Sequence, residues 1–153
     1  MKPQDNTKFP QRINLPHARL SWVSEAALYF ITVNCLERGI NTLCHAETAD
    51  LLRESVEYRA KRADWHVRLL LLMPDHLHML ATFPNSVQMK KVITGWKGYT
   101  AKRCGFHWQR DFFDHRLRSD ESYVEKAAYI RDNPVRKELI DEPSAWPYVW
   151  TWE

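Results

Sequence analysis

Residues 65–83 read WHVRLLLLMPDHLHMLATF. Two apolar runs flank Pro74-Asp75, a pair of residues typical of a turn. The run before the turn predicts a largely buried strand over residues 65–73, and the run after it predicts a second strand over residues 76–83. We therefore interpret the stretch as strand, turn and strand.

The residues before and after this stretch predict a further strand and two helices. Residues 28–34 (LYFITVN) are rich in β-branched and aromatic side chains and predict a strand. Apolar residues spaced among charges over residues 47–62 predict an amphipathic helix. A second helix is expected at about residues 87–104, with Ser86 as its cap. Its buried stripe is expected to consist of Val92, Ile93, Trp96 and Tyr99.

The C-terminal part of the chain completes the pattern with one more strand and helix. Residues 108–117 predict a strand, and a helix is expected to open at Ser119 and Ser122 and to run to about residue 132, where Asn133-Pro134 ends it. The order is β-α-β-β-α-β followed by a helix. This is the split βαβ arrangement of an α+β, ferredoxin-like (RRM-like) fold, with an antiparallel sheet and two helices on one face.

Length and composition limit the protein to a few classes. The chain has 153 residues, enough for one domain and too few for two ordinary ones. We expect a single domain over residues 1–153, with a core at about 28–140 and an aromatic tail over 143–153. Its longest apolar run, residues 26–31, is far shorter than a membrane helix. The polar N-terminus and three cysteines without close pairing predict a cytoplasmic protein with reduced thiols.

Positive charge is concentrated in one part of the chain. The formal net charge is only +3, but residues 76–110 contain no Asp or Glu. A stretch of one sign predicts a positive face, and abundant Arg and Trp suit phosphate binding and base stacking. Equally, the tryptophans can fill the core while the lysines solubilise one helix. The basic residues of this stretch are Lys90, Lys91, Lys97, Lys102, Arg103 and Arg110.

His76-Leu77-His78 lies in a predicted strand, so both imidazoles project from the same face of the sheet. Two neutral imidazoles this close are a ready pair of ligands for a divalent metal. The alternative is a pair of ordinary polar residues on a solvent-exposed face. Other metal motifs, such as His-Glu-x-x-His and Cys-x-x-Cys, are absent from the sequence.

Tyr129 and Asn133 are four residues apart at the end of a predicted helix and share one face. A tyrosine hydroxyl becomes a competent nucleophile when a nearby cation favours the phenoxide, and an Asn oxygen could bind that cation. Alternatively, Tyr129 is a core aromatic residue and Asn133 a helix cap. Tyr123, on another side of the same helix, is a competing candidate for the nucleophile.

Several of these motifs together resemble a known family. Residues 72–80 (LMPDHLHML) resemble the His-hydrophobic-His (HUH) motif of single-tyrosine transposases. Residues 113–116 (FDHR), residues 129–136 (YIRDNPVR) and Trp146-Pro147 are similar to the pattern of REP-associated tyrosine transposases, where REP denotes a repetitive extragenic palindrome. The resemblance runs from about residue 28 to residue 150, and the family has the ferredoxin-like fold that the periodicity predicts.

The resemblance implies an active site. His76, His78 and Asn133 would be the ligands of Mg²⁺ or Mn²⁺, and Tyr129 would be the nucleophile that forms a 5′-phosphotyrosine link and releases a 3′-OH. Asp75 stands where such proteins often have Asn. Its carboxylate would either tune the metal or cap the turn, and we favour the turn.

The function implied is that of a metal-dependent endonuclease and strand transferase that cleaves single-stranded DNA at REP-type hairpins in the bacterial cytoplasm. The alternatives are a non-catalytic hairpin-binding protein that regulates or maintains repeats, and a small metal-dependent hydrolase that forms no covalent adduct. The connection between Arg118 and the Tyr129 helix is short. We therefore expect Tyr129 to meet the histidines of its own chain, and a monomer rather than a dimer.

Basic residues on the second predicted helix and around Tyr129 are candidates for contacts with DNA phosphates. The alternative is that about half of them are solvated charges. The aromatic tail is expected either to dock on the domain, which we favour, or to stack on a displaced base. The candidate DNA contacts are Lys90, Lys91, Lys97, Lys102, Arg103, Arg110, Arg116, Arg118, Arg131 and Arg136.

Overall fold

A five-stranded antiparallel sheet, in the order β4-β1-β3-β2-β5, forms the centre of the protein. The computed structural model describes residues 22–23, 26–118 and 121–152, so Ser119 and the polar N-terminus lie outside the described residues. The elements are β1 (Tyr29–Asn34), α1 (Ala46–Lys61), β2 (His66–Met73), β3 (His76–Thr82), α2 (Met89–Cys104), β4 (Phe113–Arg116), α3 (Tyr123–Arg131), α4 (Asn133–Arg136), a 3₁₀ turn at Pro143–Ala145, and β5 (Val149–Thr151).

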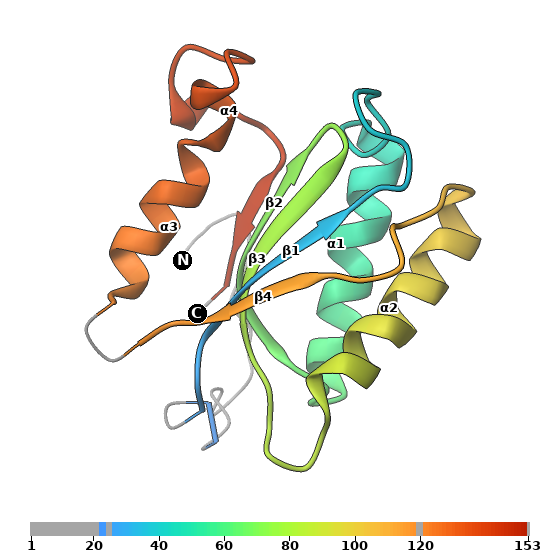
Figure 1. Ribbon diagram of the computed structural model, residues 1–153, viewed down its shortest axis with the longest axis vertical. Coiled ribbons are helices and arrows are strands. Elements are labelled where there is room, and N and C mark those ends of the chain that lie inside the picture. Colours follow the sequence, from blue (N-terminus) through green and yellow to red (C-terminus); the bar gives the residue numbers. More distant parts are fainter. Residues whose placement is uncertain (1–21, 24–25, 119–120, 153) are drawn as a thin grey trace, which may run out of the picture.

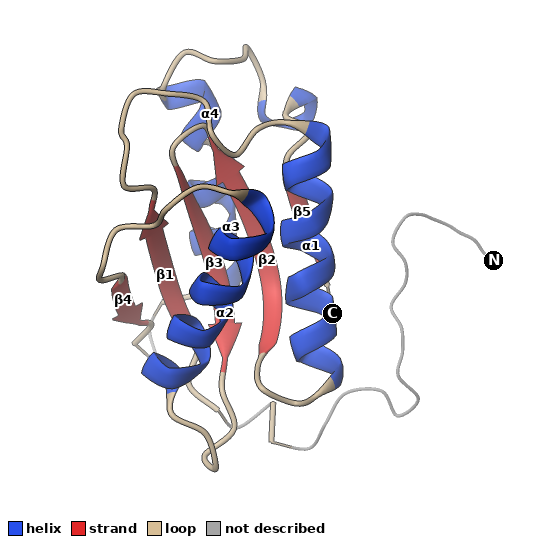
Figure 2. Cartoon of the chain, turned by 90° about the vertical axis from the view of Figure 1, so that its right-hand side faces the viewer, coloured by secondary structure: helices blue, strands red, loops and turns tan. Residues whose placement is uncertain are grey.

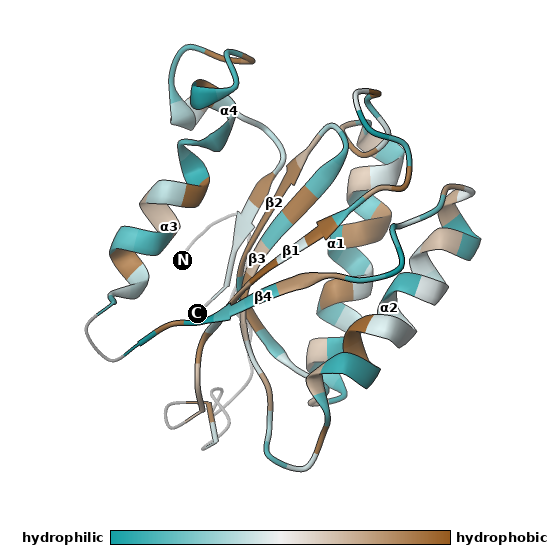
Figure 3. Cartoon of the chain, viewed as in Figure 1, coloured by the Kyte–Doolittle hydropathy of each residue, from teal (hydrophilic) through white to brown (hydrophobic). Residues whose placement is uncertain are grey.

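The helices form two unequal layers. Helices α1 and α2 lie side by side on one face of the sheet, and α3 crosses the opposite face (Figures 1 and 2). Hydrophobic residues follow the central strands, whereas each helix alternates between hydrophobic and hydrophilic residues (Figure 3). This is the predicted ferredoxin-like order with an added C-terminal helix, so the expected fold class is confirmed.

Strand β3 supplies side chains to both layers. Leu77, Met79 and Ala81 belong to the large core beneath α1 and α2, and Leu80 packs in a smaller core with Ala127 and Ile130 of α3. Successive residues of a strand point to opposite faces. The two histidines of β3 therefore share the α3 face with Leu80, as the period-two pattern predicts.

The large core contains a group of three tryptophans. The Trp65 and Trp96 ring centroids are 5.9 Å apart, and those of Trp96 and Trp108 are 5.7 Å apart. Each indole nitrogen donates a hydrogen bond: Trp65 to the Val56 carbonyl, Trp96 to Ser55 Oγ and Trp108 to Thr100 Oγ1. These rings fill the core with their polar atoms satisfied, so the abundance of tryptophan here reflects packing.

Some local expectations were wrong. Tyr99 is exposed and accepts a hydrogen bond from Arg103, while Thr100 is buried in its place. The N-cap of α2 is Gln88 rather than Ser86, and no side chain caps this helix. The predicted strand over residues 108–117 is reduced to the short β4 and an isolated bridge between Trp108 and Cys35. The prediction that Ser122 caps the last helix is confirmed, because its Oγ accepts from the Glu125 amide at 2.9 Å.

The aromatic tail docks on the domain, as expected. Strand β5 pairs with the outer edge of β2, which gives the backbone groups of that edge partners. Trp146 Nε1 donates to the Leu72 carbonyl at 3.0 Å, and Trp152 Nε1 donates to Glu57 at 3.0 Å. The tail is therefore attached to β2 by strand pairing and the Trp146 hydrogen bond, and to α1 by the Trp152 hydrogen bond. None of the helices in the described part of the chain has the length and apolarity needed to cross a membrane.

Candidate active site

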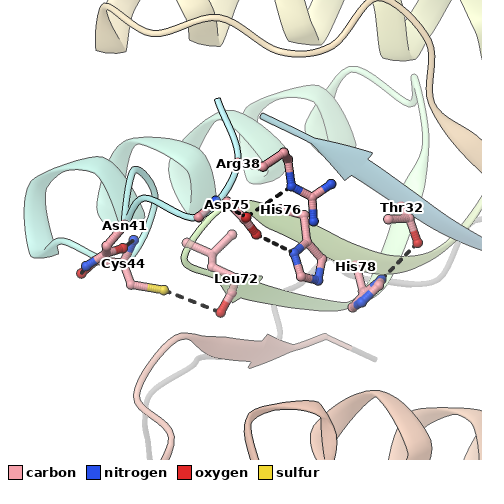
Figure 4. A network of polar contacts seen from close by, with 9 residues as sticks. Thr32, Arg38, Asn41, Cys44, Leu72, Asp75, His76 and His78 are labelled. Atoms are coloured by element: carbon pink, nitrogen blue, oxygen red, sulfur yellow. Dashed lines mark hydrogen bonds and ion pairs between the residues drawn. The ribbon is translucent and has the colours of Figure 1, made fainter. Parts of the chain in front are cut away.

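Two histidine rings lie together on the face of β3 that α3 crosses. The ring centroids of His76 and His78 are 4.9 Å apart. His78 lies opposite Thr32 in the β1–β3 register, and Thr32 Oγ1 shares a hydrogen bond with His78 Nδ1 at 2.9 Å. His76 Nδ1 donates to Asp75 at 2.9 Å. Figure 4 shows both contacts. Each ring is thus fixed through Nδ1, and neither Nε2 has a partner among the described residues.

Asp75 joins this pair to the loop after β1. Its carboxylate accepts from Arg38 Nε at 3.0 Å and from His76 (Figure 4), and it also accepts from the Gly39 amide at 2.8 Å. Burial alone would raise its pKa, but these hydrogen bonds and the Arg38 charge lower the pKa of Asp75 to about 2. The role that we favoured, a cap of its own turn, is replaced by one that orients His76 and anchors the loop.

Both histidines are poor bases in this position. Burial, the neighbouring His76 and the Arg136 charge lower the pKa of His78 to about 3. Burial also lowers the pKa of His76, with contributions from Arg38 and Lys137, although Asp75 opposes them. The rings are therefore neutral at neutral pH, which is the form of imidazole that binds a metal.

Tyr129 lies on α3 with 53% of its surface exposed. Arg136 stacks over its ring, with Cζ 4.1 Å from the centroid. On α3, Lys126 Nζ lies 5.3 Å from the Tyr129 centroid and 5.2 Å from that of Phe30, whose ring centroid is 5.2 Å from that of His78. A continuous series of contacts therefore joins the tyrosine to the histidine pair. The competing Tyr123 is engaged elsewhere, beneath the Arg68 guanidinium at 3.7 Å.

Asn133 is buried, with 7% of its surface exposed, and begins the short helix α4. The cap of α3 is Asp132, so Asn133 is not the helix cap that we kept as an alternative. Its side-chain amide has no hydrogen-bond partner among the described residues. No group of three or more His, Cys, Asp and Glu side chains within those residues could hold a metal. The donor set that the family resemblance predicts, two imidazole nitrogens and one amide oxygen, would suit a divalent cation with open coordination positions.

Lys126 is a functional candidate that the sequence interpretation missed. It precedes Tyr129 by three residues, and residues three apart on a helix are neighbours on its surface. That spacing could have identified it.

The candidate DNA contacts do not form one group. Lys90, Lys91, Lys102 and Arg103 are exposed on α2, which lies on the opposite side of the sheet from the histidines. Arg116 is exposed on β4, at the edge of the sheet. The remaining members are exposed Arg110 and Arg118, partly buried Arg131, and Arg136, which alone among them stacks on Tyr129.

Lys97 differs from the other basic residues of α2, and its burial contradicts the expectation that it contacts DNA phosphates. Only 8% of its surface is exposed. Its ammonium donates to the carbonyls of Gln109, Arg110 and Asp111 at 2.7, 2.9 and 3.3 Å. Lys97 therefore holds the chain that leads into β4, and we remove it from the DNA-binding set.

The fold and this arrangement of side chains are typical of one class of proteins. An antiparallel ferredoxin-like sheet, a His-hydrophobic-His pair on its central strand and a tyrosine on a helix across that strand are the features of the HUH tyrosine transposases. A family model described as "Transposase IS200 like" matches residues 28–132. The chain belongs to this family, which confirms the resemblance.

Individual relatives agree with this assignment. The chain is 25% identical to the REP-associated tyrosine transposase of Escherichia coli (strain K12) over 130 residues, which cover 78% of this chain and 73% of the relative. A solved structure of a REP-associated tyrosine transposase bound to a REP hairpin superposes with a TM-score of 0.71 at 21% identity, covering 94% of this chain and 82% of that one. That likeness supports the fold.

Proposed function

We propose that this protein is a metal-dependent transferase that cleaves single-stranded DNA at REP-type hairpins and holds the cut 5′ end on Tyr129. The observation that carries the proposal is the series of contacts from exposed Tyr129, through Lys126 and Phe30, to the oriented histidine pair. A core tyrosine would be buried, whereas Tyr129 is accessible to a macromolecular substrate.

His76 Nε2, His78 Nε2 and the side-chain oxygen of Asn133 would hold Mg²⁺ or Mn²⁺. The bound cation would polarise a phosphate oxygen and offset the negative charge that grows in the transition state. Mg²⁺ prefers oxygen ligands, so a set with two imidazoles favours Mn²⁺ as the better activator. The Asp75 carboxylate can only accept, so it keeps His76 in the tautomer that presents Nε2, and Thr32 would do the same for His78 by accepting from Nδ1.

Tyr129 carries the covalent step. Its Oη forms a bond to phosphorus as the phenolic proton leaves, and the bond from phosphorus to the 3′ oxygen breaks, so that this oxygen takes up a proton and departs as a 3′-OH. The product is a phosphodiester between Tyr129 and the 5′ end. Because one phosphodiester replaces another, the strand can be rejoined by the reverse reaction without an external energy source.

Lys126 and Arg136, which both lie against the Tyr129 ring, would assist the attack. Cations at 5.3 Å and 4.1 Å from its centroid favour negative charge on the phenol oxygen as it attacks. The Arg136 guanidinium also has donors for two phosphate oxygens. The same pair would then stabilise the phosphotyrosine until the strand is rejoined.

A hairpin with a single-stranded flank is the substrate that the relative bound to a REP hairpin suggests for this chain. The exposed basic residues would contact its phosphates, with Arg136 at the cut and the α2 residues on a more distant part of the DNA. Because α3 packs on the sheet of its own chain through Ala127 and Ile130, we propose that a monomer carries a complete site.

Detection of a covalent adduct tests the proposal. The protein is incubated with Mn²⁺ or Mg²⁺ and labelled single-stranded hairpins of the REP type taken from its own genome, and the products are separated on a denaturing gel. We expect an adduct with the wild-type protein and with Tyr123→Phe, the matched control, and none with Tyr129→Phe. An adduct that survives Tyr129→Phe overturns the assignment of the nucleophile.

Tight binding of several hairpins without any adduct in either metal would support the alternative of a non-catalytic hairpin-binding protein. Cleavage that leaves no protein–DNA link would instead support a metal-dependent hydrolase. Each of these outcomes contradicts the proposed covalent mechanism.

A further inference from the structure

An open hollow of about 450 Å³ lies beside His76, at the end of the sheet where β2 turns into β3. Its walls come from three segments: the loop after β1, the β2–β3 turn and the residues after α4. These segments gather at the same end of the molecule (Figure 1). The hollow is large enough for one nucleotide, since ordinary small-molecule sites have volumes of about 300–1,000 Å³.

Two aliphatic side chains from segments far apart in the sequence line this hollow. Ile40 is 53% exposed and Leu139 is 46% exposed. Large apolar side chains that converge on a concave surface are typical of a binding site, whereas isolated ones need no explanation. They offer two apolar contacts for a flat ligand.

The backbone holds both aliphatic residues in place. Gly39 has φ +82° and its amide is bound to Asp75, which sets the direction of the chain at Ile40. Glu138 has φ +61°, an uncommon value for a residue other than glycine, and the next amide, that of Leu139, donates to the Pro134 carbonyl at 2.9 Å. These hydrogen bonds therefore fix the backbone from which Ile40 and Leu139 extend.

The charged residues around the hollow leave one net positive charge, which favours an anionic ligand. Arg38 and Lys137 line it on two different segments, and Asp75 is the only lining acid among the described residues. That acid is already occupied by Arg38, Gly39 and His76 (Figure 4). Lys137 has no ion-pair partner in the described part of the chain. A ligand with both an apolar plane and an anionic group is complementary to this lining.

We propose that the hollow binds one nucleotide of the DNA strand, next to the phosphate that is cut, with the base between Ile40 and Leu139 and its phosphate between Arg38 and Lys137. The inference rests on the proposed function, because it takes single-stranded DNA as the substrate. A base that leaves the stack to enter such a hollow can be selected by shape at a single position beside the cleavage site.

The test uses protein that carries Tyr129→Phe, so that binding is measured without cleavage. Hairpins with an abasic site at each flanking position in turn are titrated by fluorescence anisotropy. We expect one position near the cut at which loss of the base weakens binding roughly tenfold, as for other bases packed on side chains. Leu139→Trp fills the hollow. In this variant we expect the abasic hairpin and the intact hairpin to bind equally well. Leu36→Trp, at an exposed leucine outside the hollow, is the matched control and keeps the loss.

A second measurement does not depend on cleavage or on the hairpin. Deoxynucleoside 5′-monophosphates are added to the isotope-labelled wild-type protein, and we expect amide resonances of Gly39, Ile40 and Leu139 to shift, and not to shift in Leu139→Trp. Equal shifts with inorganic phosphate alone would overturn the proposal, because they would define an anion site without a base.

The results separate this inference from the proposed function. An adduct that depends on Tyr129, with no abasic position that Leu139→Trp affects, removes the nucleotide site and leaves the transferase. Nucleotide binding in the hollow without any adduct retains the site and removes the transferase.

Discussion

The two faces of the sheet differ in how much apolar surface they bury. On one face, α1 and α2 have 16 residues each, and each buries three apolar side chains: Ala49, Leu52 and Val56 in α1, and Val92, Ile93 and Trp96 in α2. On the other, α3 has 9 residues and buries only Ala127 and Ile130. The same strands supply both faces, because alternate residues of β2 and β3 enter one core or the other.

This difference indicates that one face of the sheet stabilises the fold while the other face carries the candidate active site. A face fully covered by helices supplies the hydrophobic free energy that the fold needs. The second face can then hold the partly buried His76 and His78 under a lightly attached helix. Substitutions on the first face should therefore change the free energy of unfolding, and those on the second should change metal binding, cleavage or local order. Four predictions test this division.

The largest effect is expected from Trp96→Ala, in the core beneath α1 and α2. Trp96 is fully buried between two other tryptophans, and its indole nitrogen binds Ser55. We expect the free energy of unfolding to fall by about 3–5 kcal/mol, measured from urea unfolding curves. Val124→Ala, at an exposed position of α3, should change it by less than about 0.5 kcal/mol. Similar losses for the two variants would contradict the division between the faces.

The next effect is expected at the histidine pair, where Thr32→Val removes the hydroxyl that fixes His78. Partners that orient metal-binding histidines contribute roughly 10- to 100-fold to metal affinity. We therefore expect Mn²⁺ to bind that much more weakly by calorimetric titration, while stability changes little.

Thr82→Val is the matched control for this prediction. Thr82 is buried on the same strand as His78, and its hydroxyl has no partner in the described part of the chain. Replacing an unpaired buried hydroxyl with a methyl group should leave Mn²⁺ affinity unchanged. Equal weakening by both variants would mean that the Thr32 hydroxyl does not act through His78.

The sequence predicts the fold well because its signals are local and repeated. The alternation of Leu77, His78 and Met79 assigns each residue to a face of the sheet before any contact is known. The Tyr129–Asn133 spacing predicts that both residues share one face of a single helix, whereas α3 ends at Arg131 and Asn133 begins α4. The family motifs select this pair of candidates from other possible pairs. Such patterns need only the geometry of one strand or one helix.

Features that depend on distant contacts could not be predicted in this way. Lys97 resembles its neighbours in a basic helix, and only the carbonyls of residues 109–111 make it a buried support. Asp75 resembles a turn residue until the loop at Arg38 and Gly39 folds against it. Strand β5 has only three residues, and its pairing with β2 depends on an edge formed much earlier in the chain.

A smaller effect is expected at the nucleophile, from Arg136→Gln. Arg136 lies over the Tyr129 ring, so its loss removes a cation from beside the phenol. We expect the rate of adduct formation to fall about tenfold, or about 1.4 kcal/mol in activation free energy. Arg131→Gln has no ring contact to remove and should leave the rate within about twofold. The rate is measured in single-turnover reactions with saturating protein, so that weaker DNA binding does not enter it.

The smallest effect is expected where α3 begins. Ser122 Oγ accepts a hydrogen bond from the Glu125 amide at 2.9 Å, and Ser122→Ala removes this cap. Losing an N-cap typically costs about 1 kcal/mol. Because α3 buries only two side chains, we expect the cost to appear as local opening: faster hydrogen exchange in α3, with α1 and α2 unchanged.

Ser86→Ala is the control, because Ser86 precedes α2 without capping it and should have no such effect. If Ser122→Ala instead accelerates exchange throughout the sheet, α3 and the large core unfold together, and the two faces are one cooperative unit. If the change stays within α3, the helix that carries Tyr129 can move without disturbing the core. Such movement would let the attached 5′ end reach a second strand before it is rejoined.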